Sequence, residues 1–272
     1  MPRRLATCLA LAAVVSVAAP AGADEPPALV SRPGLEWTLT VVGGAVWLTE
    51  TLAIAELAPS DCRWCDSNRL DDRARELAWS DPEVARVSSD LISYGIAPLA
   101  AGGLLTLGAF RDGRAGDLTT DLLIVAEAAV AAGVSGDLIR VVSGRERPWV
   151  HDLAPEDKPA TDRPEQNNLS FISGHSATAF ALAVSSGTVA SRRGRRIAPA
   201  IWVTGLTLAV ATSYLRIASE QHYLTDVLAG VGTGVAIGLA VPFLHRPRGS
   251  RPAVAAMVAP VRGGGLVLVT FR

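Results

Sequence analysis

The chain has 272 residues, of which 49% are hydrophobic and 19% charged, and its formal net charge is −1. This composition argues against a disordered chain, because it supplies enough apolar surface to bury a large core. It also argues against a nucleic-acid-binding protein, because phosphate backbones are bound through an excess of basic residues that this chain lacks.

The first predicted element is a targeting segment over residues 1–23. Two arginines precede an apolar stretch at residues 5–19, and the small residues Ala-Gly-Ala follow at 21–23. A basic flank, a short apolar stretch and a small-residue cleavage site predict a secretory signal peptide that is cut after Ala23. The alternative is an uncleaved membrane anchor, since apolar start segments grade continuously into anchors.

Residues 24–87 are predicted to form an N-terminal extracytoplasmic segment, exposed outside the membrane or lying on its surface. This segment contains the pair Cys62 and Cys65. A lone C-x-x-C pair needs a second pair of ligands to hold zinc, and no other His or Cys lies nearby in the sequence. In an oxidising compartment these cysteines are therefore expected to form a local, structural disulfide.

Five long apolar stretches follow, and each is near the ~20 residues needed to span a bilayer. They lie at residues 91–110, 118–139, 174–191, 197–215 and 227–244. The second stretch is interrupted by three acidic residues, which we expect to face the bundle interior or the water boundary. Residues 37–57 are not counted as a span, because Glu50 and Glu56 interrupt them. The sequence thus predicts a helical bundle over residues 88–244 with about five membrane-spanning helices.

Positive charge gives this bundle an orientation. The arginine-rich stretches at residues 111–114, 192–196 and 245–251 would lie at one end of a five-span bundle. The arginine-rich side of a membrane protein faces the cytoplasm. The opposite end is therefore expected to face the periplasm, in a bacterial inner membrane. A soluble periplasmic protein stays an alternative, because the buried helices of a large domain can be equally apolar.

The last span and the C-terminal tail carry two further patterns. Gly230, Gly234 and Gly238 recur at a spacing of four, which predicts a smooth stripe for close helix packing. Residues 245–272 form the tail, and its apolar stretch at 266–271 indicates a short strand.

Three polar clusters interrupt the apolar pattern, all at the end that is predicted to face outward. They are Arg140 with Arg147, then Ser173-Gly174-His175, and then Arg216 with His222 and Asp226. Arginine presents a planar fork of donors that matches phosphate oxygens, so three arginines in one pocket indicate an oxyanion ligand. Ser173 is expected to cap a helix whose free N–H groups bind the same anion.

His222 and Asp226 are four residues apart, so on a helix they share a face and the carboxylate can hold the imidazole in one tautomer. A histidine oriented in this way can attack phosphorus and form a phosphohistidine, while His175 protonates the leaving oxygen. Zinc bound by these three residues is the weaker alternative, because the surrounding arginines would repel a cation. The two other histidines and Arg145 are interpreted as interfacial or topology residues.

These residues resemble the type 2 phosphatidic acid phosphatase family, which shares its fold with vanadium haloperoxidases and bacterial class A acid phosphatases. The matching motifs are Arg140-x6-Arg147-Pro148, Ser173-Gly174-His175 and Arg216-x5-His222-x3-Asp226. Each motif is weak alone, whereas all three in order on one side of a predicted bundle are specific. The resemblance covers residues 88–244 and implies an all-α helical bundle.

The resemblance also implies a role for each motif residue. His222 would be the nucleophile, Asp226 its orienting partner and His175 the general acid. The phosphoryl oxygens would be held by Arg140, Arg147, Arg216, Ser173 and the Gly174 backbone N–H. Neither a metal nor another cofactor is implied.

Three positions depart from the family pattern: Arg140 replaces a Lys, Ile172 a Pro and Leu215 a Ser. The arginine is expected to keep the phosphate contact with a different geometry. The missing serine is expected to cost one hydrogen bond.

The predicted function is hydrolysis of a phosphomonoester or diphosphate, on a phosphorylated lipid or a polyprenyl diphosphate whose tail stays in the membrane. Three alternatives are left open. They are a soluble periplasmic acid phosphatase, a vanadate-dependent haloperoxidase using the same pocket, and a non-catalytic membrane protein that binds phospholipid.

Overall fold

The computed structural model describes residues 29–30, 32–245, 254–261 and 264–271. The predicted signal peptide at residues 1–23 lies outside this part of the chain. The chain divides into two compact units, residues 26–247 and residues 1–25 together with 248–272. Each unit is described by itself.

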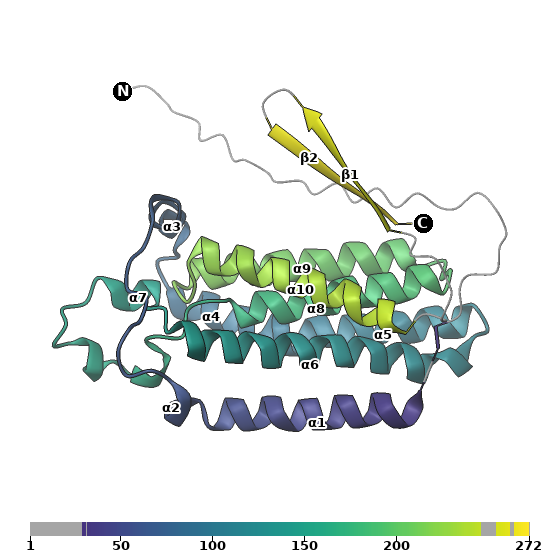
Figure 1. The fold of residues 1–272 in the computed structure, drawn as a ribbon, viewed down its shortest axis with the longest axis horizontal. Helices are drawn as coiled ribbons and strands as arrows, with labels where there is room; N and C mark the ends of the chain where they lie inside the picture. The colour runs from purple at the N-terminus through teal and green to yellow at the C-terminus, as the bar shows by residue number, and fades with distance from the viewer. Residues whose placement is uncertain (1–28, 31, 246–253, 262–263, 272) are drawn as a thin grey trace. The chain divides into compact units, whose positions relative to one another are not determined.

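The larger unit is the predicted helical bundle (Figure 1). Its α-helices are α1 Pro33–Leu52, α2 Ile54–Leu57, α3 Arg69–Ala74, α4 Pro82–Leu91, α5 Ala97–Arg111, α6 Leu118–Ser143, α7 Pro148–His151, α8 Gly174–Arg192, α9 Ala198–Ala218 and α10 Leu224–Leu244. A π-helical stretch, η2 Ile92–Ile96, joins α4 to α5, and short 3₁₀ turns lie at Arg75–Leu77, Ala115–Asp117, Lys158–Ala160 and Pro164–Gln166.

Helix α8 lies at the centre of the bundle, in contact with α5, α6, α9 and α10 (Figure 1). Nearly all of its residues are buried. They are mostly Ala, Ser, Gly and Thr, whose small side chains let the surrounding helices approach closely. The Ser-Gly-His motif lies at the start of α8. The packing of α8 at the centre of the bundle therefore fixes the position of this motif.

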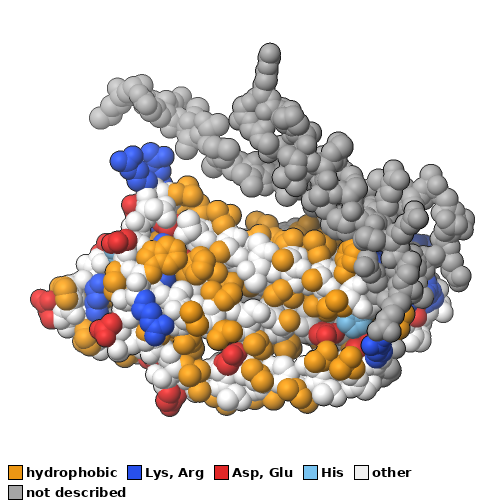
Figure 2. All heavy atoms as spheres, viewed as in Figure 1, with side chains coloured by type: hydrophobic (Ala, Val, Ile, Leu, Met, Phe, Trp, Pro, Cys, Tyr) orange, Lys and Arg blue, Asp and Glu red, His pale blue; other side chains and the backbone are white. Residues whose placement is uncertain are grey.

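Four helices are long and apolar enough to cross a bilayer: Pro82–Arg111, Ala115–Ser143, Ala198–Ala218 and Leu224–Leu244. They coincide with four of the five predicted spans. The fifth predicted span is α8, which is less apolar because many of its residues are small or polar. Most of these residues are buried against other helices of the protein. Large hydrophobic side chains remain exposed on the outer helices, and Figure 2 shows them spread along the side of the bundle. These are features of a membrane protein.

Helix α1 differs from the expectation for residues 24–87, because it packs along α6 within the larger unit (Figure 1). The contact is close: a Cβ atom on Gly133 would lie 2.4 Å from the Trp47 ring. Of the two glutamates that argued against a span here, Glu50 lies near the C-terminal end of α1 and Glu56 belongs to α2; Glu36 lies near the start of α1. Glu36 lies 3.4 Å from His245 Nε2, and Glu50 lies within the electrostatic reach of Arg140. The predicted boundary at residue 88 falls inside α4.

The acidic residues of α6 face basic partners inside the bundle, as the sequence predicts. Asp121 pairs with Arg193 and Arg195, Glu127 with His245, and Asp137 with Arg140. Pairing offsets part of the free energy that is needed to remove these charges from water.

The glycine stripe of α10 packs against α8, which confirms the predicted packing role. A Cβ atom on Gly230 would lie 2.5 Å from the Ser173 carbonyl oxygen, and one on Gly234 would lie 2.3 Å from the Ala177 carbonyl oxygen. Real Cβ atoms do not approach backbone oxygens so closely. These glycines therefore set the distance between α8 and α10, and with it the position of the Ser-Gly-His motif.

Gly234→Ala is expected to destabilise the protein by about 1–3 kcal/mol, because the added methyl group overpacks a backbone contact. The matched control is Gly232→Ala on the same helix, where no atom lies within 4 Å of the added Cβ. Thermal unfolding of the purified protein measures both. An equal melting temperature for the two variants would contradict this packing role.

The smaller unit contributes one antiparallel hairpin among the described residues. Strand β1 covers Val254–Val261 and β2 covers Gly264–Phe271, with Val254 opposite Phe271. The sequence predicts the second strand but not its partner, whose composition of Ala, Val and Pro carries no clear alternation.

Candidate active site

The three motifs meet at one end of the bundle. Helix α6 ends there at Ser143, α9 ends there at Ala218, and α8 and α10 begin there at Gly174 and Leu224. Gly144 terminates α6 in the left-handed conformation, with φ of 56°, which glycine adopts without steric cost. The arginine-rich connections lie at the other end, where these same helices have their opposite termini.

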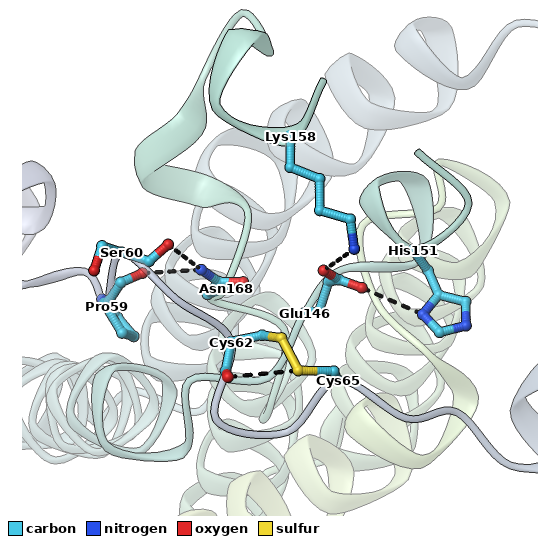
Figure 3. The surroundings of a disulfide bond; sticks show 8 residues. All are labelled: Pro59, Ser60, Cys62, Cys65, Glu146, His151, Lys158 and Asn168. Carbon is cyan, nitrogen blue, oxygen red and sulfur yellow. Dashed lines mark hydrogen bonds and ion pairs between the residues drawn. A yellow bond between two sulfur atoms is a disulfide. The ribbon is translucent and has the colours of Figure 1, made fainter. Parts of the chain in front are cut away.

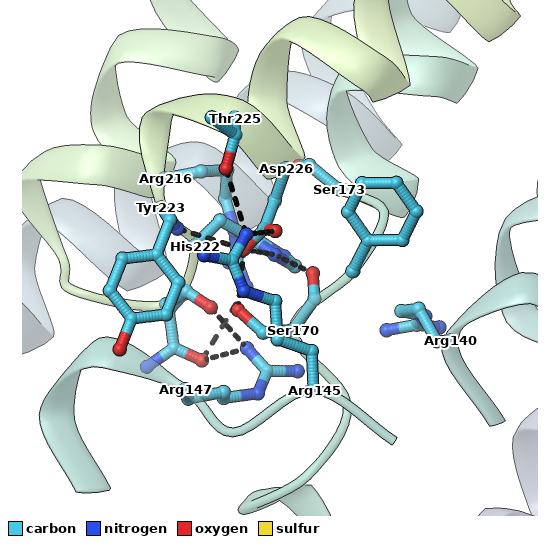
Figure 4. Close-up of polar contacts among 12 residues, drawn as sticks. Arg140, Arg145, Arg147, Ser170, Ser173, Arg216, His222, Tyr223, Thr225 and Asp226 are labelled. Atoms are coloured by element: carbon cyan, nitrogen blue, oxygen red, sulfur yellow. Dashed lines mark hydrogen bonds and ion pairs between the residues drawn. The ribbon is translucent and has the colours of Figure 1, made fainter. Parts of the chain in front are cut away.

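His222 lies at the centre of this site (Figure 4) and is 1% exposed. Its Nδ1 atom lies 2.6 Å from the Ser170 carbonyl oxygen, which accepts the Nδ1 hydrogen. This assigns the tautomer with the lone pair on Nε2. Nε2 is buried and has no hydrogen-bond partner within the described part of the chain.

The electrostatic surroundings of His222 favour the neutral ring. Burial, followed by the positive charges of Arg147, Arg216 and Arg140, lowers the pKa of His222 well below its usual 6.5. The imidazole is therefore uncharged at neutral pH, with an available lone pair. The same result shows that the three predicted arginines act together on this one histidine.

Asp226 does not hold His222 in the way the sequence predicts. Its Oδ2 atom lies 4.0 Å from His222 Nδ1, outside hydrogen-bond distance. It accepts hydrogen bonds from Ser170 Oγ at 2.6 Å and from the Tyr223 backbone N–H at 2.9 Å. The predicted geometry assumed that both residues lie on one helix, whereas α10 begins at Leu224, after the histidine. Asp226 therefore positions Ser170, whose carbonyl oxygen accepts from His222, and Tyr223, which follows His222 in the sequence.

Arg147 and Arg216 are both buried and share a partner. The Arg147 Nη1 atom donates to Gln221 Oε1 at 2.8 Å, and the Arg216 Nη2 atom donates to the same oxygen at 3.5 Å. Arg147 also donates to Gln166. The side-chain amide of Gln221 therefore holds two guanidinium groups close together beside His222. Its oxygen accepts from both, which offsets part of the repulsion between their like charges.

Arg140 lies at the edge of the group in Figure 4 and pairs with Asp137 on its own helix. Its Cζ atom lies 3.8 Å from the position that a Cβ on Gly174 would occupy. Glycine at this position therefore brings the start of α8 against the guanidinium group. Arg140, the substitute for the family's Lys, faces the same helix start as the sequence predicts.

Ser173 is the N-cap of α8, which confirms that prediction. Its Oγ atom accepts hydrogen bonds from the Ser176 backbone N–H at 3.4 Å and the Ser176 hydroxyl at 3.0 Å. The Ser173 backbone N–H donates to the Asp226 carbonyl oxygen at 3.0 Å. The helix start is therefore attached to α10, close to His222.

His175 has a partner that the sequence analysis missed. Its Nε2 atom lies 2.8 Å from Oδ1 of Asp90, in α4. The same carboxylate oxygen accepts from Arg216 Nη1 at 3.2 Å. No motif marks Asp90, and only the packing of α4 against α9 brings it to the site.

A cavity of about 220 Å³ lies beside His175. It is bounded by α1, η2, α6 and α8, and its lining includes Trp47, Tyr94, Gly133, Arg140 and Gly174. Asp137, which pairs with Arg140, also lines it, so the cavity wall holds a carboxylate as well as a guanidinium group. Helix α1, which lies outside the motifs, thus forms part of its wall.

Arg145 is the second residue that sequence reasoning missed, since it was interpreted as a topology or lipid-contact residue. Its side chain is fully buried and donates to both Asp226 and Asp71, the latter at 2.8 Å. The guanidinium lies between the Trp64 and Tyr223 rings, 4.0 and 4.2 Å from their centroids. Arg145 therefore links Asp226 to the N-terminal segment through charge pairing and cation–π contacts.

The predicted disulfide between Cys62 and Cys65 is present (Figure 3). Its loop pairs with the segment that follows α6: the Arg63 N–H donates to the Gly144 carbonyl oxygen at 2.9 Å, and the Glu146 N–H donates to the Trp64 carbonyl oxygen at 3.0 Å. The disulfide loop thereby places Trp64 over Arg145. This is a structural role, as predicted.

The remaining histidines lie away from His222. His151 contacts Glu146 at 3.3 Å, near the disulfide loop (Figure 3), and His245 follows α10 at the opposite end. Among the described residues, no three His, Cys, Asp or Glu side chains are grouped as metal ligands.

Fold and site together define a helical bundle with four membrane-length apolar helices and with buried arginines close to a buried histidine. Residues 121–249, which carry all three motifs, match the family model described as the PAP2 superfamily.

One solved structure is similar over 76% of this chain and 96% of its own length, with 18% sequence identity and a TM-score of 0.45. It is the first transmembrane PAP2-type phosphatidylglycerolphosphate phosphatase from Bacillus subtilis. No curated protein matches the chain.

Proposed function

We propose that this protein hydrolyses a phosphomonoester or diphosphate on a lipid or polyprenyl headgroup, through a phosphohistidine on His222. The observation that carries the proposal is the Nε2 atom of His222, which is buried, unpartnered among the described residues and surrounded by arginines. A neutral imidazole nitrogen is a nucleophile, and guanidinium groups bind the negative oxygens of a phosphoryl group.

The reaction has two steps. Nε2 of His222 attacks phosphorus, and the bond from phosphorus to the leaving oxygen breaks as His175 donates a proton to that oxygen. The ring of His222 gains positive charge, which the Ser170 carbonyl oxygen stabilises through Nδ1. Water then attacks the phosphohistidine and gives its proton to His175, which releases inorganic phosphate and restores both histidines.

The position of the site supports a substrate that is held by the membrane. The phosphate pocket lies at the ends of apolar helices, and the cavity beside His175 extends between α1, α6 and α8. Trp47 and Tyr94 place aromatic rings on the wall of the cavity that Arg140 also lines. A lipid phosphate can place its headgroup at the arginines while its tail stays in the bilayer.

We infer that the site faces the periplasm, because the arginine-rich connections lie at the other end of the bundle. Helix α1 begins at that arginine-rich end, since the Val30 N–H donates to the His245 carbonyl oxygen at 2.6 Å. Reporter fusions at residues 113 and 157, with the mass of the mature protein, test this orientation.

Phosphate release by the purified full-length protein tests the proposed activity. The substrates are phosphatidate, phosphatidylglycerophosphate, undecaprenyl diphosphate and a soluble aryl phosphate, each with and without a metal chelator. We expect turnover of at least one lipid substrate, unchanged by the chelator, because the reaction above uses only side chains of this protein. Tight lipid binding without turnover would favour the non-catalytic alternative, and peroxide-dependent halide oxidation after addition of vanadate would favour the haloperoxidase.

A further inference from the structure

Asp90 is a carboxylate that contacts two of the proposed site residues at once. Its Oδ1 atom lies within hydrogen-bond distance of both His175 Nε2, at 2.8 Å, and Arg216 Nη1, at 3.2 Å. Its other oxygen accepts from Arg86 Nη1 at 2.9 Å. One carboxylate therefore contacts the proposed general acid and one of the proposed phosphate-binding arginines. Asp90 lies outside the residues that match the family model.

The ring of His175 is held on two sides by this part of the chain. Tyr94, four residues after Asp90, packs edge-on against the imidazole with ring centroids 4.9 Å apart and an interplanar angle of 61°. The His175 side chain is 12% exposed, so these two contacts act in a largely buried setting. Asp90 and Tyr94 thus restrict both the direction and the plane of the ring.

We propose that Asp90 is the positioning residue of the general acid: it holds the Nε2 hydrogen of His175 and leaves the Nδ1 hydrogen for the leaving oxygen. This rests on the proposed function, in which His175 donates that proton. A carboxylate can only accept hydrogen bonds, so it selects the ring orientation in which Nε2 carries a hydrogen.

The proton balance is complete without a further reactant. Before transfer, both ring nitrogens of His175 carry hydrogen and the imidazolium pairs with the Asp90 carboxylate. As phosphorus leaves the substrate oxygen, the Nδ1 hydrogen passes to that oxygen and His175 becomes neutral with its Nε2 hydrogen still on Asp90. The attacking water of the second step returns a proton to Nδ1.

The test compares two leaving groups in the same variant. Nitrophenyl phosphate releases a phenolate that leaves without protonation, whereas hexyl phosphate releases an alkoxide that requires the acid. For Asp90→Asn, kcat/KM for hexyl phosphate is expected to fall by about 10²-fold, the lower range of what a general acid contributes. The value for nitrophenyl phosphate is expected to fall by much less, because only the shared contact to Arg216 is altered.

The ratio of the two kcat/KM values cancels the fraction of correctly folded enzyme, so it isolates the effect on the acid. An unchanged ratio in Asp90→Asn would overturn the positioning role, and so would a rise in kcat/KM for hexyl phosphate, which would show that the carboxylate blocks the site. Asp90→Glu, which keeps a carboxylate, is expected to restore part of the ratio.

The matched control is Glu83→Gln on the same helix. Glu83 also pairs with Arg86 but is 62% exposed, and we expect its loss to leave the ratio unchanged. A wild-type protein that hydrolyses neither substrate nor any lipid phosphate would instead count against the proposed function. The two failures are therefore distinguishable.

Discussion

Replacing His222 with alanine is expected to abolish phosphate release from every substrate of the wild-type protein, with a loss of at least about 10⁴-fold in kcat. The reason is that the Nε2 lone pair forms the bond to phosphorus in the proposed reaction, so its loss removes the attacking atom. Because burial and the arginines lower the pKa of His222, its neutral form persists below pH 6.5. The measurement is steady-state phosphate release, together with rapid quenching in base to detect the phosphohistidine.

His151→Ala is the matched control, since His151 lies at the same end of the bundle and contacts Glu146 instead of His222. It is expected to retain activity and to form the phosphohistidine. A His222→Ala protein with wild-type turnover, or a phosphohistidine that still forms in it, would refute the assignment of the nucleophile.

Replacing Arg145 with methionine is expected to lower the free energy of unfolding by about 3–5 kcal/mol. Arg145 is the shared cation of Asp71 and Asp226, and all three side chains are fully buried. Its removal leaves two carboxylates without their countercharge inside the protein, and methionine supplies only the apolar part of the contact with Trp64 and Tyr223. The measurement is thermal or denaturant unfolding of the purified protein.

The double variant Arg145→Met with Asp71→Asn is expected to recover part of this loss, because it removes one of the two unpaired charges. Arg73→Met, at an exposed position on α3, serves as the control and is expected to change stability by less than about 0.5 kcal/mol. If Arg145→Met were as stable as this control, the buried network would not stabilise the fold.

Local patterns in the sequence predict the helices and most of the candidate site. The apolar stretches correspond to α5, α6, α8, α9 and α10, because a helix long enough to cross a bilayer needs about 20 such residues in one run. Ser173 caps α8 as predicted, since capping depends on neighbours three residues away. Arg147 and Arg216 meet beside His222 because successive helices end at alternate ends of the bundle. Arg140 lies at the edge of this group (Figure 4).

Other features depend on contacts between distant parts of the chain, which no local pattern reports. Asp90 reaches His175 across 85 positions, and Asp71 reaches Arg145 across 74. Glu50 argued against a span at residues 37–57, yet it lies within the electrostatic reach of Arg140 on α6. In each case a charged side chain can lie inside the protein because packing of distant segments brings a partner of opposite charge close to it.

The amino-acid sequence by itself determined the helical class, the three motifs and most of the residues that lie close to His222, because these depend on composition and short spacings. Only the tertiary structure decided how the histidines are held. His222 lies before the first turn of α10, so its Nδ1 hydrogen goes to the Ser170 carbonyl oxygen and not to Asp226. A spacing of four places two side chains together only when both belong to one helix, and where a helix begins is decided by the contacts of its first turn.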